Sequence, residues 1–167
     1  MNRIGFGRRV GMLAAITLAC TGQVSPASAQ ADEAGREAVL SVLDRLFDGM
    51  RMGDSAMVGS VFHPSAQLIG TAERDGAPVV SVIPIDRFVT AVGNATGEWD
   101  EPYWDSIVQI RDNLATVWTK YSFYLDGKFS HCGVDAFMLA RTEAGWKIIS
   151  LADTRQSDGC ELPPGRN

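Results

Sequence analysis

The sequence predicts an α+β fold, in which helices come first and a long antiparallel sheet comes last. Three observations lead to this prediction. An apolar repeat with helical spacing occupies residues 32–52. From residue 103 onwards, runs rich in Val, Trp, Thr and Tyr alternate with turn signals. The composition is globular, with 46 % hydrophobic and 21 % charged residues among 167. This segregation of helices and strands argues against a parallel, doubly wound sheet.

The first 29 residues have the pattern of a secretory signal. A basic start is followed by a short apolar run over residues 10–20, and Ala27-Ser28-Ala29 has the small-x-small pattern of a cleavage site. The apolar run is shorter than the roughly 20 residues that span a bilayer. We therefore expect a signal peptide at 1–29 with cleavage near Ala29, and a single periplasmic or secreted domain at 30–167.

Three other interpretations of this segment stay open. An amphipathic surface helix would show part of the same pattern. Arg8-Arg9 resembles a twin-arginine signal, although Gly11 weakens the apolar run that should follow. Cys20 follows Thr17-Leu18-Ala19, which resembles a lipoprotein box, but Thr17 stands where an aliphatic residue is usual. Lipidation of Cys20 is therefore the lesser alternative.

Three helices are expected in the first half of the domain. The first, over 32–52, has its apolar side chains at i, i+4, i+7 and i+11, namely Val39, Leu43, Leu46 and Met50. A second, shorter helix begins at Asp54 or Ser55 and ends at His63-Pro64, since a residue before proline avoids the helical region. The third begins at Pro84 and ends at Gly93-Asn94.

Strands account for most of the remaining chain. Two short strands are expected at 67–71 and 79–82, between the second and third helices. Four longer strands follow, and Asp126-Gly127 is the strongest hairpin signal among their turns. Their expected ranges are 103–111, 115–125, 128–141 and 146–154.

Composition and motifs exclude several functions. The net charge of −5 argues against nucleic-acid binding, and no stable membrane insertion is expected. The sequence lacks a glycine-rich phosphate loop and a His/Cys cluster with metal-ligand spacing, so we expect neither cofactor nor metal. Cys132 and Cys160 are the two cysteines left after cleavage. An oxidising compartment would permit a disulfide, but sequence alone leaves two free thiols equally open.

Several short stretches resemble a known superfamily: Val61-Phe62-His63-Pro64, Ala115-x-Val117-Trp118, the run His131 to Phe137, Gly145-Trp146-Lys147-Ile148 and Asp153-Thr154-Arg155. Together they resemble nuclear transport factor 2-like proteins, which include ketosteroid isomerase, scytalone dehydratase and SnoaL-like cyclases. The resemblance covers roughly residues 33–160 and is strongest to small bacterial members described as lumazine-binding. It implies a cone-shaped domain in which three helices pack on a curved antiparallel sheet, with a pocket between them. It does not imply a substrate.

Asp135 is the main candidate site residue. A two-residue turn at Asp126-Gly127 would pair Trp118 with Asp135, so that Trp118, Gly133, Asp135 and Phe137 share one face. The resemblance implies that this face lines the pocket, with Gly133 leaving room for a ligand. In an apolar pocket the pKa of Asp135 would rise, and the residue could act as a general acid or base. Alternatively, it pairs with the Trp118 indole N–H, with Lys120 or with a helix N-terminus. A one-residue slip would reverse the face.

The other candidates are His63 and the aromatic residues. His63 could pair with Asp135 in a catalytic dyad. Alternatively, it is a histidine at a helix C-terminus that donates a hydrogen bond to a backbone carbonyl. His131, near the hairpin end, is expected to face solvent. Trp118 and Tyr103 could stack a flat ligand.

Three functions follow from these candidates. The preferred one is an exported domain that binds a small hydrophobic or aromatic molecule. The second is a cofactor-independent lyase or isomerase that uses Asp135 and His63. The third is a dimerising scaffold, a homodimer formed through the convex face of the sheet. Binding is preferred because acid–base catalysis usually needs two placed groups, and only Asp135 is a convincing one.

Overall fold

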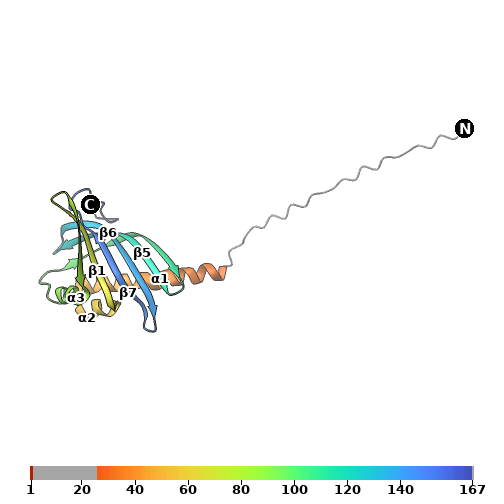
Figure 1. Ribbon diagram of the computed structural model, residues 1–167, viewed down its shortest axis with the longest axis horizontal. Helices are drawn as coiled ribbons and strands as arrows, with labels where there is room; N and C mark the ends of the chain where they lie inside the picture. Colours follow the sequence, from red (N-terminus) through yellow and green to blue (C-terminus); the bar gives the residue numbers. More distant parts are fainter. Residues whose placement is uncertain (2–25, 167) are drawn as a thin grey trace.

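The structure is a computed structural model that describes residue 1 and residues 26–166. The predicted signal peptide, apart from residues 1 and 26–29, lies outside the described residues, as does Cys20. The α+β class and the arrangement of three helices with a curved sheet are confirmed (Figure 1). The helices are α1 (Pro26–Met52), α2 (Ser55–Val61) and α3 (Ile85–Gly93). The strands are β1 (Phe62–Arg74), β2 (Ala77–Pro84), β3 (Trp99–Asp100), β4 (Tyr103–Arg111), β5 (Leu114–Leu125), β6 (Lys128–Thr142) and β7 (Gly145–Thr154).

The described strands form one seven-stranded sheet in the order β2-β1-β7-β6-β5-β3, with β4 also paired to β5. All neighbours are antiparallel except β1 and β7, which are parallel. The expected antiparallel sheet therefore contains one parallel pair. A parallel pair needs a long connection, and the chain between β1 and β7 supplies one. The two-residue strand β3 was also missed, because so short a segment carries no alternating pattern.

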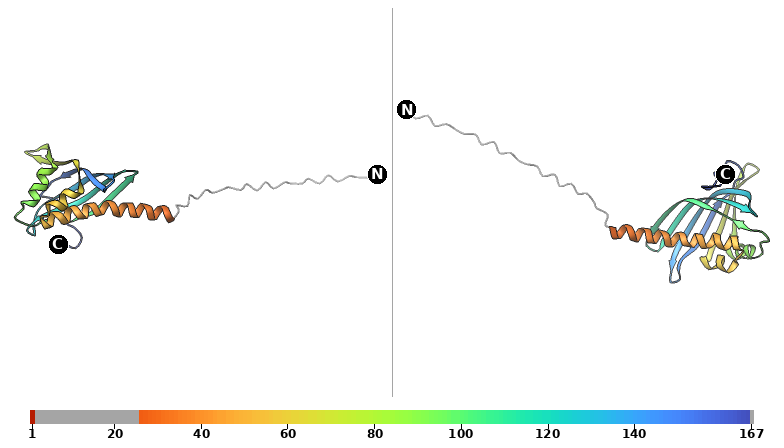
Figure 2. Two further views of the ribbon diagram at one scale, coloured as in Figure 1. Left: turned by 90° about the horizontal axis from the view of Figure 1, so that it is seen from below. Right: turned by 180° about the vertical axis from the view of Figure 1, so that it is seen from behind.

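Helix α1 crosses one face of the sheet, here called the inner face, while Figure 1 looks onto the opposite, outer face (Figure 2). The four positions predicted to form its apolar stripe are all buried. They pack in one core with inner-face residues of the sheet, including Val117, Phe137, Leu139, Ile148 and Leu151. Burial of each such side chain contributes about 1.5–3 kcal/mol. No helix among the described residues is long and apolar enough to cross a membrane.

The β5–β6 hairpin contains a bulge that changes its register. Leu125 pairs with Lys128 and Tyr124 with Phe129, as the turn predicts, but Phe123 then pairs with His131. The extra residue, Ser130, shifts all later pairs by one, so Trp118 lies opposite Ala136. The predicted pairing of Trp118 with Asp135 was therefore wrong, and the two side chains lie on opposite faces of the sheet.

Gly133 is required by the packing of the protein itself. A Cβ atom added at Gly133 would lie 1.9 Å from the carbonyl oxygen of Thr154. Real Cβ atoms do not approach backbone so closely, so the absence of a side chain lets the start of β6 meet the end of β7. Gly133 also lines a small cavity of about 150 Å³, so its role in ligand binding stays a prediction.

We expect Gly133→Ala to destabilise the fold by about 3 kcal/mol, because β6 and the end of β7 would have to separate. Gly59→Ala is the matched control, since its Cβ would lie 3.6 Å from Val89, an ordinary contact. Urea unfolding followed by circular dichroism measures both changes. A Gly133→Ala variant as stable as the control would contradict this account of the glycine.

Candidate functional site

Three carboxyl groups meet on the inner face of the sheet. Asp135 on β6 is only 2 % exposed, and Asp153, directly opposite on β7, is 7 % exposed. The third carboxyl belongs to Glu101 in the loop between β3 and β4, within side-chain hydrogen-bonding reach of Asp135. Residues far apart in the sequence are thus brought together by the sheet and one loop.

The Asp135–Glu101 pair is shifted toward its protonated forms. Burial raises the pKa of Asp135 well above its usual range, and the negative charge of Glu101 raises it further. Burial also raises the pKa of Glu101 to about 8, with a smaller contribution from the charge of Asp153. The Arg155 guanidinium opposes both shifts. Because the two carboxyls interact, they titrate as one coupled pair.

Asp153 makes an ion pair with Arg155. Nε of Arg155 donates to Oδ2 of Asp153 at 2.7 Å. Like charges directly opposite on neighbouring strands are destabilising, so a proton on Asp135 removes a repulsion with Asp153. One oxygen of each aspartate, Oδ2 of Asp135 and Oδ1 of Asp153, has no hydrogen-bond partner within the described part of the chain.

Aromatic side chains border this carboxyl cluster. The Tyr121 hydroxyl donates to the carbonyl oxygen of Thr154 at 2.9 Å. The His131 ring stacks on Phe123 at 5.0 Å and lies edge-on to Tyr121 at 5.8 Å. Burial lowers the pKa of His131, and the charge of Arg155 lowers it further. The prediction that His131 faces solvent was therefore wrong, since its ring is half-buried between aromatic residues.

His63 does not lie beside Asp135. Its Nδ1 atom is 2.7 Å from the Ser65 hydroxyl and accepts from the Ser65 backbone N–H at 3.2 Å. The preceding residue, Phe62, pairs with Ile148 on β7, whereas Asp135 pairs with Asp153 on the same strand. Ile148 and Asp153 are five residues apart, which is about 16 Å along a strand. The hypothesis of a His63–Asp135 dyad was therefore wrong.

Tyr103 and Phe137 belong to the contact between α1 and the sheet. The Tyr103 hydroxyl donates to Oδ1 of Asp44 at 2.6 Å, and its ring centroid is 5.2 Å from that of Phe47. Phe137 is buried, with its ring edge-on to Phe47 at 6.2 Å. A ligand-binding role for either residue stays a prediction. Trp118 is 54 % exposed on the outer face and cannot line a pocket beneath α1.

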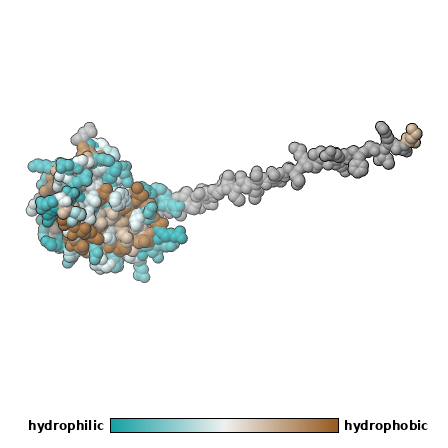
Figure 3. Space-filling model, turned by 45° about the horizontal axis from the view of Figure 1, so that its top comes forward, coloured by the Kyte–Doolittle hydropathy of each residue, from teal (hydrophilic) through white to brown (hydrophobic). Residues whose placement is uncertain are grey.

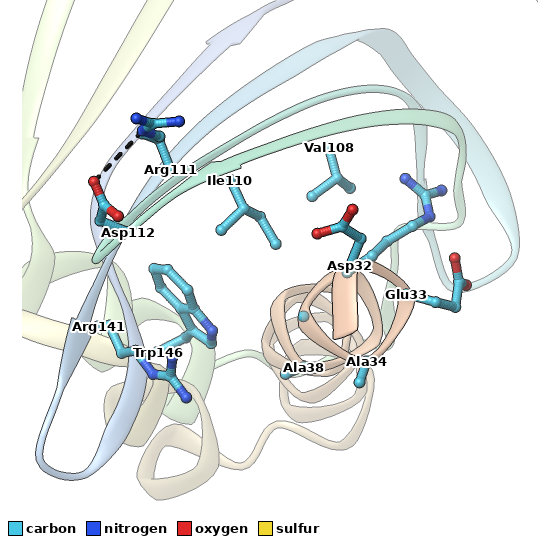
Figure 4. A pocket seen from close by; sticks show the side chains of 12 residues that line it. Asp32, Glu33, Ala34, Ala38, Val108, Ile110, Arg111, Asp112, Arg141 and Trp146 are labelled. Carbon is cyan, nitrogen blue, oxygen red and sulfur yellow. Dashed lines mark ion pairs between the residues drawn. The ribbon is translucent and has the colours of Figure 1, made fainter. Parts of the chain in front are cut away.

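A cleft of about 1090 Å³ lies between the start of α1 and the inner face of the sheet (Figure 4). Its apolar part consists of Val108 and Ile110 on β4 and Trp146 on β7. The Arg141 guanidinium lies 5.9 Å from the centroid of the Trp146 ring. The remaining lining is charged or small: Asp32, Glu33, Ala34, Gly35, Arg36, Ala38, Arg111 and Asp112.

The cleft and the carboxyl cluster are separate sites. Neither Asp135 nor Glu101 lines the cleft, and the buried core residues of α1 and the sheet lie between. No group of three or more His, Cys, Asp or Glu residues in the described ranges could hold a metal ion. Sequence reasoning missed Glu101 and the cleft residues. Asp153 belongs to one of the sequence stretches that resemble the superfamily, whereas no sequence pattern pointed to Glu101 in its loop.

We expect the stability of the protein to fall as the pH rises from about 5 to about 8. In this range an unfolded carboxyl, with a pKa of about 4, has lost its proton, whereas the raised pKa values of Asp135 and Glu101, about 8 for Glu101, leave both groups protonated in the folded state. The folded state then binds more protons, and each rise in pH favours unfolding. Asp135→Asn removes one of the two groups and should reduce the slope.

Urea unfolding at a series of pH values measures this effect. Asp75→Asn, which changes an exposed carboxyl in the β1–β2 turn, is the control and should keep the slope of the unchanged protein. If Asp135→Asn kept the same slope as well, the buried pair would not hold the proton.

The fold has many relatives among solved structures. An NTF2-like protein of unknown function from Shewanella baltica is 15% identical, with a TM-score of 0.57, covering 81% of this chain and 100% of that one. A protein titled "putative dehydratase from the NTF2-like family", from Streptomyces avermitilis, is 16% identical, with a TM-score of 0.59 and coverages of 75% and 99%. A protein titled "Putative Scytalone Dehydratase", from Novosphingobium aromaticivorans, is 8% identical, with a TM-score of 0.61 and coverages of 83% and 99%.

These identities are low, so the similarity establishes the NTF2-like fold alone. No curated protein matches the sequence. The model of one sequence family, described as "Putative lumazine-binding", matches residues 34–152. This match covers most of the chain, including α2, α3 and six whole strands, and most of α1 and β7. The chain therefore belongs to the family described as "Putative lumazine-binding", within the NTF2-like fold.

Proposed function

We propose that this protein is an exported domain that binds a small molecule in the cleft between α1 and the inner face of the sheet. The observation that carries the proposal is the composition of the cleft. Its apolar residues, Val108, Ile110 and Trp146, are bordered by arginine and carboxylate side chains. A volume of about 1090 Å³ lies just above the roughly 300–1,000 Å³ typical of ligand sites.

The lining favours a flat ligand that has both apolar and polar groups. Val108 and Ile110 offer apolar contact, while Arg36 and Arg141 offer guanidinium groups that donate to carbonyl or acidic oxygens. Lumazine, the ligand in the family description, is a flat heteroaromatic molecule with carbonyl oxygens. It is therefore a suitable first probe for the cleft.

A cofactor-independent lyase or isomerase is the alternative function. The specific observation in its favour is the Asp135–Glu101 pair, which supplies the two interacting groups that acid–base chemistry needs. Against it, the carboxyl pair does not line the cleft, so a substrate bound there would not meet it. Binding without chemistry therefore remains the preferred function.

Export is supported by two features that are far apart in the sequence. The first is the basic, apolar and small-residue pattern of residues 1–29. The second is the Cys132–Cys160 disulfide, whose Cα atoms lie 5.9 Å apart. Disulfides persist in oxidising compartments, so both features favour the periplasm or the exterior.

We expect lumazine to bind the purified protein in one copy, with quenching of its fluorescence on titration. Ala38→Trp should fill the cleft and weaken binding on the order of tenfold or more, since apolar contact area is lost. Val80→Lys on the distant strand β2 is the control. Native mass spectrometry of protein purified without refolding tests for a ligand retained from the cell. A bare chain mass, together with no response to lumazine, would contradict the proposal.

We further propose that two copies of the chain associate through the outer face of the sheet. One row of directly paired residues on that face is apolar across six strands: Ile107, Trp118, Ala136, Ala152, Ile69 and Val82. Ile107 is 61 % exposed, Trp118 54 % and Val82 59 %. Figure 3 shows hydrophobic side chains gathered on this side of the domain. The row spans about 24 Å, and a self-complementary contact would cover it.

We expect the unchanged protein to form a dimer at micromolar concentration and Trp118→Glu to shift it toward the monomer, because a charge would be buried at the centre of the contact. Sedimentation velocity measures the mass of each. Arg74→Glu, at the end of β1 beside the β1–β2 turn, is the control. A monomeric unchanged protein at about 100 micromolar, where a dimer of micromolar Kd would be largely formed, would contradict the proposal.

A further inference from the structure

The first part of α1, which forms one wall of the cleft, is attached to β4 at two neighbouring residues. A Cβ atom added at Gly35 would lie 3.4 Å from Cδ1 of Ile110, so the helix approaches the strand closely at this point. At the next residue, Nη2 of Arg36 donates to the carbonyl oxygen of Ser106 at 3.3 Å. These two contacts hold the cleft-lining side chains of α1 beside the apolar residues of β4.

Three carboxyl groups line the cleft, and they differ in position. Asp112 forms an ion pair with Arg111 at 3.5 Å, and both side chains are almost fully exposed, so this pair lies at the rim. Figure 4 shows the Glu33 side chain directed away from the cleft, whereas the Asp32 carboxylate is directed toward Val108 on β4. Asp32 is therefore the carboxylate that a ligand lying on the apolar residues would contact.

Asp32 and Arg36 place a hydrogen-bond acceptor and a donor side by side. Residues four apart on a helix are neighbours, with about 5–6 Å between their Cβ atoms. Opposite charges at this spacing can pair, yet no ion pair within the described part of the chain involves Asp32 or Arg36. One N–H group of Arg36 donates to Ser106, which leaves the other donors of the guanidinium for a ligand.

A carboxylate beside a guanidinium is complementary to a ring edge that carries a donor beside an acceptor. A cyclic imide has such an edge, because its ring N–H lies between carbonyl oxygens. The carboxylate accepts from the N–H, and the guanidinium donates to a carbonyl oxygen. A ring that bears a carboxylate group at this edge would instead be repelled by Asp32. Val108 and Ile110 exclude water from one side of the ring, which strengthens both hydrogen bonds.

We propose that the cleft selects flat heterocycles with an unsubstituted cyclic imide edge, with Asp32 accepting from the imide N–H and Arg36 donating to a neighbouring carbonyl oxygen. This inference rests on the proposed function, because it names the class of ligand that the cleft binds. It assigns the choice of ligand to two residues of α1. The apolar residues Val108, Ile110 and Trp146 supply contact area for any flat ring and do not distinguish one ring edge from another.

Lumazine and its N3-methyl derivative are the probes that test this inference. Methylation removes the N–H that lies between the carbonyl groups and leaves the ring flat. Fluorescence titration measures the Kd of each probe for the purified protein. We expect N3-methyllumazine to bind on the order of tenfold more weakly than lumazine, because the Asp32 carboxylate would lose its donor and meet a methyl group.

Variants of Asp32 show whether this residue causes the preference. Asp32→Ala removes the acceptor and makes room for the methyl group, so the two probes should bind with Kd values within about twofold of each other. Asp32→Asn keeps an amide oxygen as an acceptor and should retain part of the preference for lumazine. Glu37→Ala is the matched control, because it removes an exposed carboxylate of the same helix that does not line the cleft, and it should keep the whole preference.

The possible outcomes separate this inference from the proposed function. Equal Kd values of the two probes for the unchanged protein would overturn the inference, while binding in the cleft would stand. A preference for lumazine that persists in Asp32→Ala would also overturn it, since another group would then contact the imide N–H. Failure of both probes to bind would overturn the inference together with the proposed binding of lumazine.

Discussion

The bulge at Ser130 decides which side chains of β5 face the interior. Because side chains alternate along a strand, one extra residue in the β5–β6 hairpin places Thr119, Tyr121 and Phe123 on the inner face and turns Trp118 outward. This shift sets Thr119 opposite Asp135, and a second extra residue, Ile149 on β7, sets Asp135 opposite Asp153. The buried carboxyl cluster and the apolar row of the outer face are thus consequences of two single-residue insertions.

This arrangement gives the two faces of the sheet different roles. The inner face changes along its length from the cleft at the start of α1, through the apolar core, to the cluster of Asp135, Asp153 and Glu101. The core between them is closely packed, so the cleft and the cluster cannot share a small ligand. The outer face is apolar at its centre, and the Cys132–Cys160 disulfide links the segment that follows β7 to one end of it.

The sequence was sufficient for features that depend on local pattern. The stripe of Val39, Leu43, Leu46 and Met50 and the turn at Asp126-Gly127 were predicted correctly, and the long strands differ by one residue at most at each end. Features that depend on distant contacts were not predictable. The β1–β7 parallel pair, the approach of Thr154 to Gly133 and the position of Glu101 beside Asp135 arise from tertiary packing. No local pattern marks them.

The cost of burying the carboxyls bears on whether the cluster is structural or chemical. A carboxyl that is removed from water without full hydrogen bonding destabilises the fold, and Oδ2 of Asp135 and Oδ1 of Asp153 have no partner among the described residues. An apolar pair at these positions would avoid that cost, so stability alone does not explain the aspartates. The cluster combines a carboxyl whose pKa is raised by burial, a carboxylate that accepts from a guanidinium, and Glu101 on the loop that joins β3 and β4. The carboxyl pair is therefore the place in this domain where the residues for the acid–base alternative are found.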